Sequence, residues 1–239
     1  MTKRIDGCTL KIVAALTMFI DHFGASVVEG AWMAGRRIVS YRVYLALRLI
    51  GRIAFPIYAF LIVEGFRHTR NVWKYMGRLF FFALMSEILF DLAFYRTPVY
   101  WHHQNVYFTL ALGLLALWLW DFFRTAERIP SRPLRYLLAA SSVLAVAAAA
   151  HFLKTDYSQW GILTIAAFYV FTKSEWLRDI ASGCALLASS PLEAASFIDY
   201  VLFHFYNGKR GRQSKYFFYF FYPGHLALLA MVNRVFFGV

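Results

Sequence analysis

Long apolar runs recur along the whole chain, and charged residues interrupt them at only a few points. A run of about 20 apolar residues is long enough for an α-helix to cross the hydrocarbon core of a bilayer. Hydrophobic residues make up 60% of the 239 residues and charged residues only 16%, whereas soluble domains are roughly half apolar and a quarter charged. The sequence therefore predicts an all-α, polytopic transmembrane helical bundle that forms a single domain over residues 1–239.

The apolar runs also predict where the chain crosses the membrane. We expect spans at about 9–29, 44–65, 72–95, 105–122, 134–153, 157–172 and 216–237. The stretch 178–205 is too long for one untilted helix and too short for two spans, and Ser189-Ser190-Pro191 forms a natural break in its middle. This gives eight spans, or nine if the chain doubles back at Pro191. The Ala-rich run 139–150 has the small residues that let membrane helices pack closely.

The distribution of basic residues predicts the orientation. Lys and Arg exceed Asp and Glu by 25 to 13, which gives a net charge of +12 and fits loops that face anionic lipid better than it fits nucleic-acid binding. Thirteen basic residues fall on the side of the N-terminus and five on the other, so we expect a cytoplasmic N-terminus. The basic loop 207–212 faces the cytoplasm only if the preceding stretch doubles back, and the sequence leaves its side open.

Asp21 and His22 lie inside the first apolar run, about 15 Å beyond Lys11 at 1.5 Å per residue. A charged side chain near the bilayer centre costs about 2.5 to 3.5 kcal/mol, so such residues face protein or water and are functional candidates. A general base near neutral pH is typically an imidazole, and this favours a functional role for His22 over a packing role. Adjacent helical residues point about 100° apart, so Glu87 or a residue on another helix is as good a candidate as Asp21 for orienting His22.

Two further pairs of charged residues lie in apolar runs. Arg48 and Arg52 share a helical face in the second span, and Glu87 and Asp91 share a face in the third. We expect these groups to converge with Asp21 in the outer half of the membrane. The alternative is that Arg52 pairs with Glu87 or Asp91 only to hold the bundle together.

Polar residues near other spans are ambiguous. Gln104 and Asn105 precede the fourth span, either as an external loop or at the mouth of a cavity. Tyr222 is followed by Pro223-Gly224-His225, which places a bend and an imidazole at a depth where neither is favourable. The sequence leaves His225 open between a packing role and a site role.

Several short segments, read in order, resemble the TraX family of bacterial membrane proteins. These segments are Leu10–Gly24, Arg48–Pro56, Arg78-Leu79 with Ser86-Glu87-Ile88, Gln104-Asn105-Val106, Tyr206–Gly211, and Phe218-Tyr219 with Tyr222–His225. Each motif is short, but the series occurs in the right order over nearly the whole chain.

The resemblance implies membrane-embedded acyl transfer in the bacterial inner membrane. TraX proteins N-acetylate the pilin subunit of conjugative pili, and they resemble the larger class of transmembrane acyltransferases. His22 matches the place where that class carries its essential imidazole, and Arg48 and Arg52 followed by Pro56 look like the arginine block of type 3 membrane acyltransferases. No conjugation-specific signature is present, so the implied acceptor is a pilin N-terminus or another envelope component.

From these observations we expect an enzyme that moves an acetyl group from acetyl-CoA to an amine or hydroxyl acceptor. His22 acts as general base or as a transient acyl-imidazole, with Asp21 beside it, and Arg52 stabilises charge on the thioester oxygen. Arg48 and the loop residues Asn207, Lys209 and Arg210 bind the donor. Glu87, Asp91, Asn105, Tyr222 and His225 are supporting positions.

No metal is required by this chemistry, and Cys8 and Cys184 lie in separate segments without a metal-ligand or CxxC spacing. The main alternative is a small proton-coupled transporter or channel, because buried Asp, His, Arg and Glu also build proton relays. A transporter often has repeated halves with broken helices, and the sequence has no internal repeat. A third alternative is a structural partner in an envelope assembly.

Overall fold

The fold is known from a computed structural model that describes residues 4–212 and 214–238. These residues form helices joined by short loops, with no β-strand among them and only two isolated backbone bridges. The all-helical class is thus confirmed. Lys3, one of the basic residues counted on the N-terminal side, lies outside the described residues.

The chain divides into two compact units. The first unit consists of residues 1–58, 84–101 and 192–239, and the second consists of residues 59–83 and 102–191. Helices α4 (Ala54–His68) and α5 (Val72–Phe94) each contribute residues to both units.

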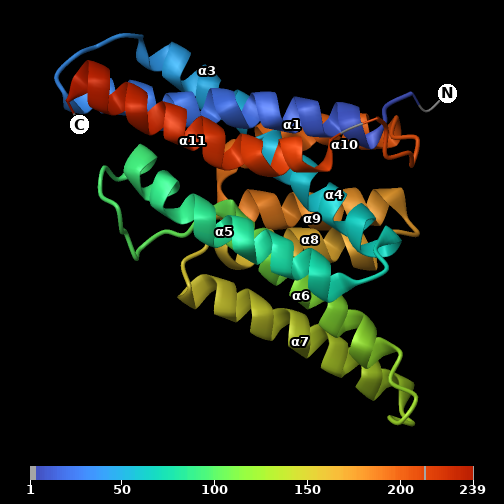
Figure 1. Cartoon of the computed structure of the whole chain (residues 1–239). Coiled ribbons are helices and arrows are strands. Elements are labelled where there is room, and N and C mark those ends of the chain that lie inside the picture. The colour runs from blue at the N-terminus through green and yellow to red at the C-terminus, as the bar shows by residue number, and fades with distance from the viewer. Residues whose placement is uncertain (1–3, 213, 239) are drawn as a thin grey trace. The chain divides into compact units, whose positions relative to one another are not determined.

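The first unit is built around the N-terminal and C-terminal helices. Helix α1 (Gly7–His22) continues through a π-helical segment, η1 (Phe23–Val28), into the short helix α2 (Glu29–Met33). The unit also contains α3 (Tyr41–Gly51), the 3₁₀ segment η2 (Pro191–Phe197), α10 (Ile198–His204) and α11 (Lys215–Phe237). Figure 1 shows α11, in red, running beside α1, in blue, and the two helices are in contact.

Local sequence signals explain where these helices begin and end. The Asp6 carboxylate accepts a hydrogen bond from the Thr9 backbone N–H at 2.8 Å and caps α1. Ser40 caps α3 through the Val43 N–H in the same way. The second predicted span is broken between Gly51 and Ala54, so α3 and α4 are separate helices. Helix α9 ends at Ser189, just before Pro191, which confirms the predicted break.

The second unit is a helical cluster with small residues at its contacts. It contains α6 (Val106–Arg124), α7 (Arg132–Phe152), α8 (Ser158–Val170) and α9 (Glu175–Ser189). Ala147 and Ala150 of α7 are buried in a core with Ala116 and Ile162, so the packing role predicted for the Ala-rich run is confirmed.

Five helical stretches of the described residues are long and apolar enough to span a membrane. They are Gly7–Met33, Tyr41–His68, Val106–Arg124, Arg132–Phe152 and Tyr216–Phe237. The other predicted spans coincide with α5, with the shorter apolar helix α8, and with α9, η2 and α10 together. The chain is therefore a helical membrane protein, whereas the number of eight spans and the cytoplasmic N-terminus stay predictions.

Candidate functional site

Asp21 binds both arginines of the second predicted span. Its carboxylate accepts hydrogen bonds from Nη2 of Arg52 at 2.9 and 3.0 Å, and Nη1 of Arg48 lies 3.0 Å from its Oδ1. Asp21 lies at the end of α1 and is only 8% exposed. The predicted convergence of these three residues is thus present, and it occurs within the first unit.

Gly51 lets α3 approach α1 closely enough for these ion pairs. A Cβ atom placed on Gly51 would overlap the side chain of Asp21, so no larger residue fits without moving one of the helices. Gly24, just after the end of α1, faces Leu47 of α3. A Cβ atom added to Gly24 would lie only 3.2 Å from the Cβ atom of Leu47. Small residues at both points explain why two charged helices pack tightly here.

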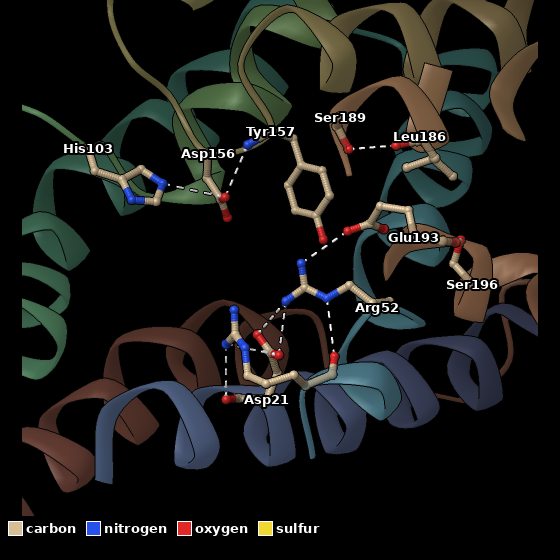
Figure 2. Close-up of polar contacts among 10 residues, drawn as sticks. Asp21, Arg52, His103, Asp156, Tyr157, Leu186, Ser189, Glu193 and Ser196 are labelled. Carbon is tan, nitrogen blue, oxygen red and sulfur yellow. Dashed lines mark hydrogen bonds and ion pairs between the residues drawn. The ribbon is translucent and has the colours of Figure 1, made fainter. Parts of the chain in front are cut away.

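Arg52 connects Asp21 with a second carboxylate, that of Glu193 in η2. Nη1 of Arg52 donates to Oε1 of Glu193 at 3.0 Å, and Nε donates to the backbone carbonyl of Arg48 at 3.2 Å. Figure 2 shows Arg52 extended between Asp21 and Glu193. Pairing of Arg52 with Glu87 or Asp91 was the alternative that the sequence left open, and these ion pairs run to Asp21 and Glu193 instead. Two guanidinium groups and two carboxylates thus form a cluster that is neutral overall.

A third carboxyl group, Asp199, is buried near Glu193. Asp199 lies on the short helix α10 and is 0% exposed, and neither of its carboxylate oxygens has a hydrogen-bond partner among the described residues. A negative charge on this fully buried carboxyl group, close to Glu193, is unfavourable.

His22 is paired with His225 of α11. Nδ1 of His22 lies 2.7 Å from Nε2 of His225, and Nδ1 of His225 lies 2.9 Å from the backbone carbonyl oxygen of Phe221. The two imidazole rings are stacked, with an interplanar angle of 21°. The residue that holds His22 is therefore on another helix, which was one of the two alternatives, and Asp21 is engaged by the arginines instead.

Aromatic rings enclose the histidine pair. Phe94 of α5 and Tyr222 of α11 contact the His22 ring edge-on, and the ring of Phe221 stacks on His225. His225 is only 5% exposed. Tyr222, predicted as a supporting position, thus lines the histidine pair.

The π-helical segment that follows His22 carries a second buried polar group. The Ser26 hydroxyl donates to the backbone carbonyl of Ala93 at 2.6 Å, and Nδ2 of Asn233 donates to the Ser26 hydroxyl at 2.8 Å. Both side chains are fully buried. π-helical turns are rare and are found frequently at functional sites. Here the segment follows His22 directly in the sequence, and Ser26 links it to α5 and α11.

The basic loop 207–212 lies at the N-terminal end of α1. The Asn207 N–H donates to the Ile5 carbonyl and the Gly7 N–H donates to the Lys209 carbonyl, both at 2.8 Å. The Asn207 side chain accepts from the Lys209 N–H and so shapes the loop. Gly211 has φ +73° and packs against Asp6, where a side chain has no room. The loop therefore lies at the same end of α1 as Ile5 and Asp6.

The remaining predicted residues have local structural contacts. Asp91 and Glu87 both lie on α5. Asp91 accepts a hydrogen bond from the Tyr100 N–H at 2.7 Å and holds the loop after α5. Asn105 belongs to the second unit, where it caps α6 through the Tyr107 N–H and donates to the Ala83 carbonyl at 2.8 Å. Asn105 thus caps α6 and links α6 to α5.

Sequence reasoning missed Glu193, Asp199, Ser26 and Asn233. Glu193 and Asp199 are acidic residues in a largely apolar stretch, and the cost of burying such groups was a usable signal. Ser26 and Asn233 carried little signal, because such side chains commonly serve as hydrogen-bonding contacts between membrane helices.

Together, these features define a helical membrane protein with a buried, charge-neutral Arg–carboxylate cluster next to a hydrogen-bonded histidine pair. The chain belongs to the TraX family, because the family model described as "TraX protein" matches residues 6–233. A curated relative, "Probable fimbrial assembly protein FimC, serogroup H1" of Dichelobacter nodosus, is 33% identical over 266 aligned residues. The alignment covers 96% of this chain and 97% of that relative. No solved structure matches the chain.

Proposed function

We propose that this protein is a membrane-embedded acyltransferase that moves an acetyl group from acetyl-CoA to an amine or hydroxyl of an envelope component. The observation that carries the proposal is the proximity of an imidazole and a guanidinium cluster inside one helical unit: His22 and Asp21 are adjacent, and Asp21 binds Arg48 and Arg52. The relative from D. nodosus is named for fimbrial assembly, so a fimbrial or pilin subunit is the first acceptor to test.

In the proposed reaction, His22 removes the proton from the acceptor's neutral amine or hydroxyl. The lone pair of the acceptor forms a bond to the thioester carbonyl carbon, and negative charge develops on the carbonyl oxygen. The C–S bond then breaks, and the sulfur leaves as a thiolate that takes the proton back from His22. The products are the acetylated acceptor and coenzyme A, so no other reactant is needed.

Arg48 and Arg52 supply positive charge for the developing oxyanion. Such preorganised donors act strongly in a site that excludes water. Arg52 is fixed by three acceptors, namely Asp21, Glu193 and the Arg48 carbonyl, so its position costs little reorganisation during the reaction. The Arg48 side chain is more exposed, 24% against 15% for Arg52, and is the better placed of the two to contact a bound donor.

The charged nucleotide end of the donor fits the N-terminal end of α1, which is the end opposite His22. Lys209 and Arg210 lie beside Gly7, and His22 is 15 residues further along the same helix, about 22 Å at 1.5 Å per residue. Phosphates cannot enter hydrocarbon, whereas the slender pantetheine arm can. We propose that the basic loop holds the nucleotide and that the arm carries the thioester along α1 toward His22.

The test follows radiolabel from [1-¹⁴C]acetyl-CoA into envelope components. Membranes that contain the wild-type protein are compared with membranes that contain His22→Gln, and with His204→Gln, an exposed histidine of α10, as the matched control. We expect labelling that depends on His22 and not on His204. Equal labelling with and without His22 would overturn the proposal. The proposal would also fall if the purified protein did not bind acetyl-CoA and acetyl-CoA did not raise its thermal stability.

A further inference from the structure

The tautomers of the histidine pair follow from one contact at its end. The Phe221 carbonyl oxygen can only accept a hydrogen bond, so Nδ1 of His225, 2.9 Å away, must carry the proton of that bond. Burial of a charged imidazolium among membrane helices is costly, and His225 is 5% exposed, so its neutral form is favoured. In the neutral ring with a proton on Nδ1, Nε2 of His225 is an acceptor.

The tautomer of His22 follows from the tautomer of His225. Its Nδ1 lies 2.7 Å from the acceptor atom Nε2 of His225, so this nitrogen of His22 must be the donor. A neutral imidazole has one proton, and Nε2 of His22 is then the atom with the lone pair. The chain of bonds runs from Nδ1–H of His22 to His225 and from His225 to the Phe221 carbonyl.

From this geometry we infer that His225 is a positioning residue that fixes His22 in the Nδ1–H tautomer and leaves Nε2 of His22 as the basic atom. The catalytic part of this inference rests on the proposed function, whereas the tautomer does not. A second imidazole here takes the place that a carboxylate takes in a catalytic triad. When Nε2 of His22 accepts a proton, its Nδ1–H bond to His225 becomes charge-assisted and shorter, which stabilises the imidazolium.

Residues of the same turn of α11 orient the His225 ring. Pro223 lies within the helix, between Phe221 and His225. Proline has no N–H to donate and it disturbs the turn before it. The Phe221 carbonyl receives a bond from the His225 ring, and the Phe221 ring stacks on that imidazole. The backbone carbonyl and the ring of Phe221 thus both fix the orientation of His225.

The tautomer is measured directly on the full-length protein in detergent micelles, without an acceptor. Long-range ¹H–¹⁵N spectra of [¹⁵N]histidine-labelled protein distinguish a protonated ring nitrogen from an unprotonated one. The chain has seven histidines, and spectra of His22→Gln and His225→Gln assign the two signals by their loss. We expect protonated Nδ1 and unprotonated Nε2 in both rings. A proton on Nε2 of His22 in the neutral protein would overturn the inference.

Two variants of His225 test the positioning role. His225→Phe keeps a ring that stacks on Phe221 but has no nitrogen, whereas His225→Gln keeps one acceptor and one donor. In His225→Phe we expect His22 to populate both tautomers, and we expect kcat for acetyl-CoA turnover to fall about tenfold to a hundredfold with KM nearly unchanged, as for loss of a hydrogen bond to a charged group. His225→Gln should restore most of kcat.

The outcomes separate this inference from the proposed function. If His22→Gln abolishes acetyl transfer while His225→Phe changes neither kcat nor the His22 tautomer, the inference is wrong and the acyltransferase proposal stands. If the spectra show the expected tautomer but the protein transfers no acetyl group, the tautomer assignment holds and the acyltransferase proposal falls. Size-exclusion profiles and helical circular dichroism of both variants identify any loss of fold.

Discussion

Replacement of Arg52 by Gln should destabilise the first unit far more than the equivalent change at a surface ion pair. Arg52 donates hydrogen bonds to two carboxylates, and the side chain of its partner Glu193 is only 1% exposed. Removal of one partner of a buried ion pair typically costs about 3 to 5 kcal/mol, because the remaining charge stays buried. Asp21 keeps Arg48 as a partner, so Glu193 carries most of this cost.

Arg124→Gln is the matched control, because Arg124 pairs with Asp121 on the surface, with side chains 40% and 32% exposed. Exposed pairs of this kind contribute about 0.2 to 1 kcal/mol. The free energy of unfolding of the two variants is compared in detergent by denaturant titration. Equal losses for Arg52→Gln and Arg124→Gln would refute the reasoning. Rescue by the double variant Arg52→Gln/Glu193→Gln, which also removes the buried negative charge of Glu193, would support it.

Three other changes have expected outcomes. Asp199 is fully buried and its carboxylate oxygens have no hydrogen-bond partner among the described residues, so its ionisation opposes folding; Asp199→Asn should make the melting temperature less dependent on pH from 5 to 8 in thermal melts. Gly51→Ala should destabilise the protein by about 1 to 3 kcal/mol through overpacking, whereas Gly77→Ala, in open space, should be neutral or stabilising in the same melts. The double variant Lys209→Gln/Arg210→Gln should weaken acetyl-CoA binding about tenfold or more in calorimetry, and unchanged affinity would remove the loop from the donor site.

Part of the site was predictable from the sequence because the cost of burying charge is local information. Asp21, Arg48 and Arg52 stand in apolar runs, and such groups must find partners. The arginines could be placed on one helical face from their spacing, and their meeting with Asp21 followed from the shared depth. The same cost of burial applies to Glu193, just beyond the break at Pro191, but no local pattern indicates that Glu193 lies beside Arg52.

Other parts of the site could not be read from the sequence, because they depend on contacts between distant segments. His22 and His225 are 203 residues apart, and no local pattern indicates that α1 and α11 lie side by side. The position of the loop 207–212 is set by backbone hydrogen bonds to Ile5 and Gly7, which leave no trace in the side-chain pattern. The full burial of Asp199 likewise depends on how distant segments pack around α10.

The charge balance of the cluster bears on the proposed chemistry. Two unpaired arginines beside His22 would oppose its protonation during the reaction, whereas Asp21 and Glu193 cancel their charge at rest. When the thioester carbonyl gains negative charge, the guanidinium groups are already in place to stabilise it, and the carboxylates hold them there. In the proposed reaction the same two carboxylates would therefore serve both requirements: they would permit a positive imidazolium at His22, and they would keep the donors for the oxyanion fixed.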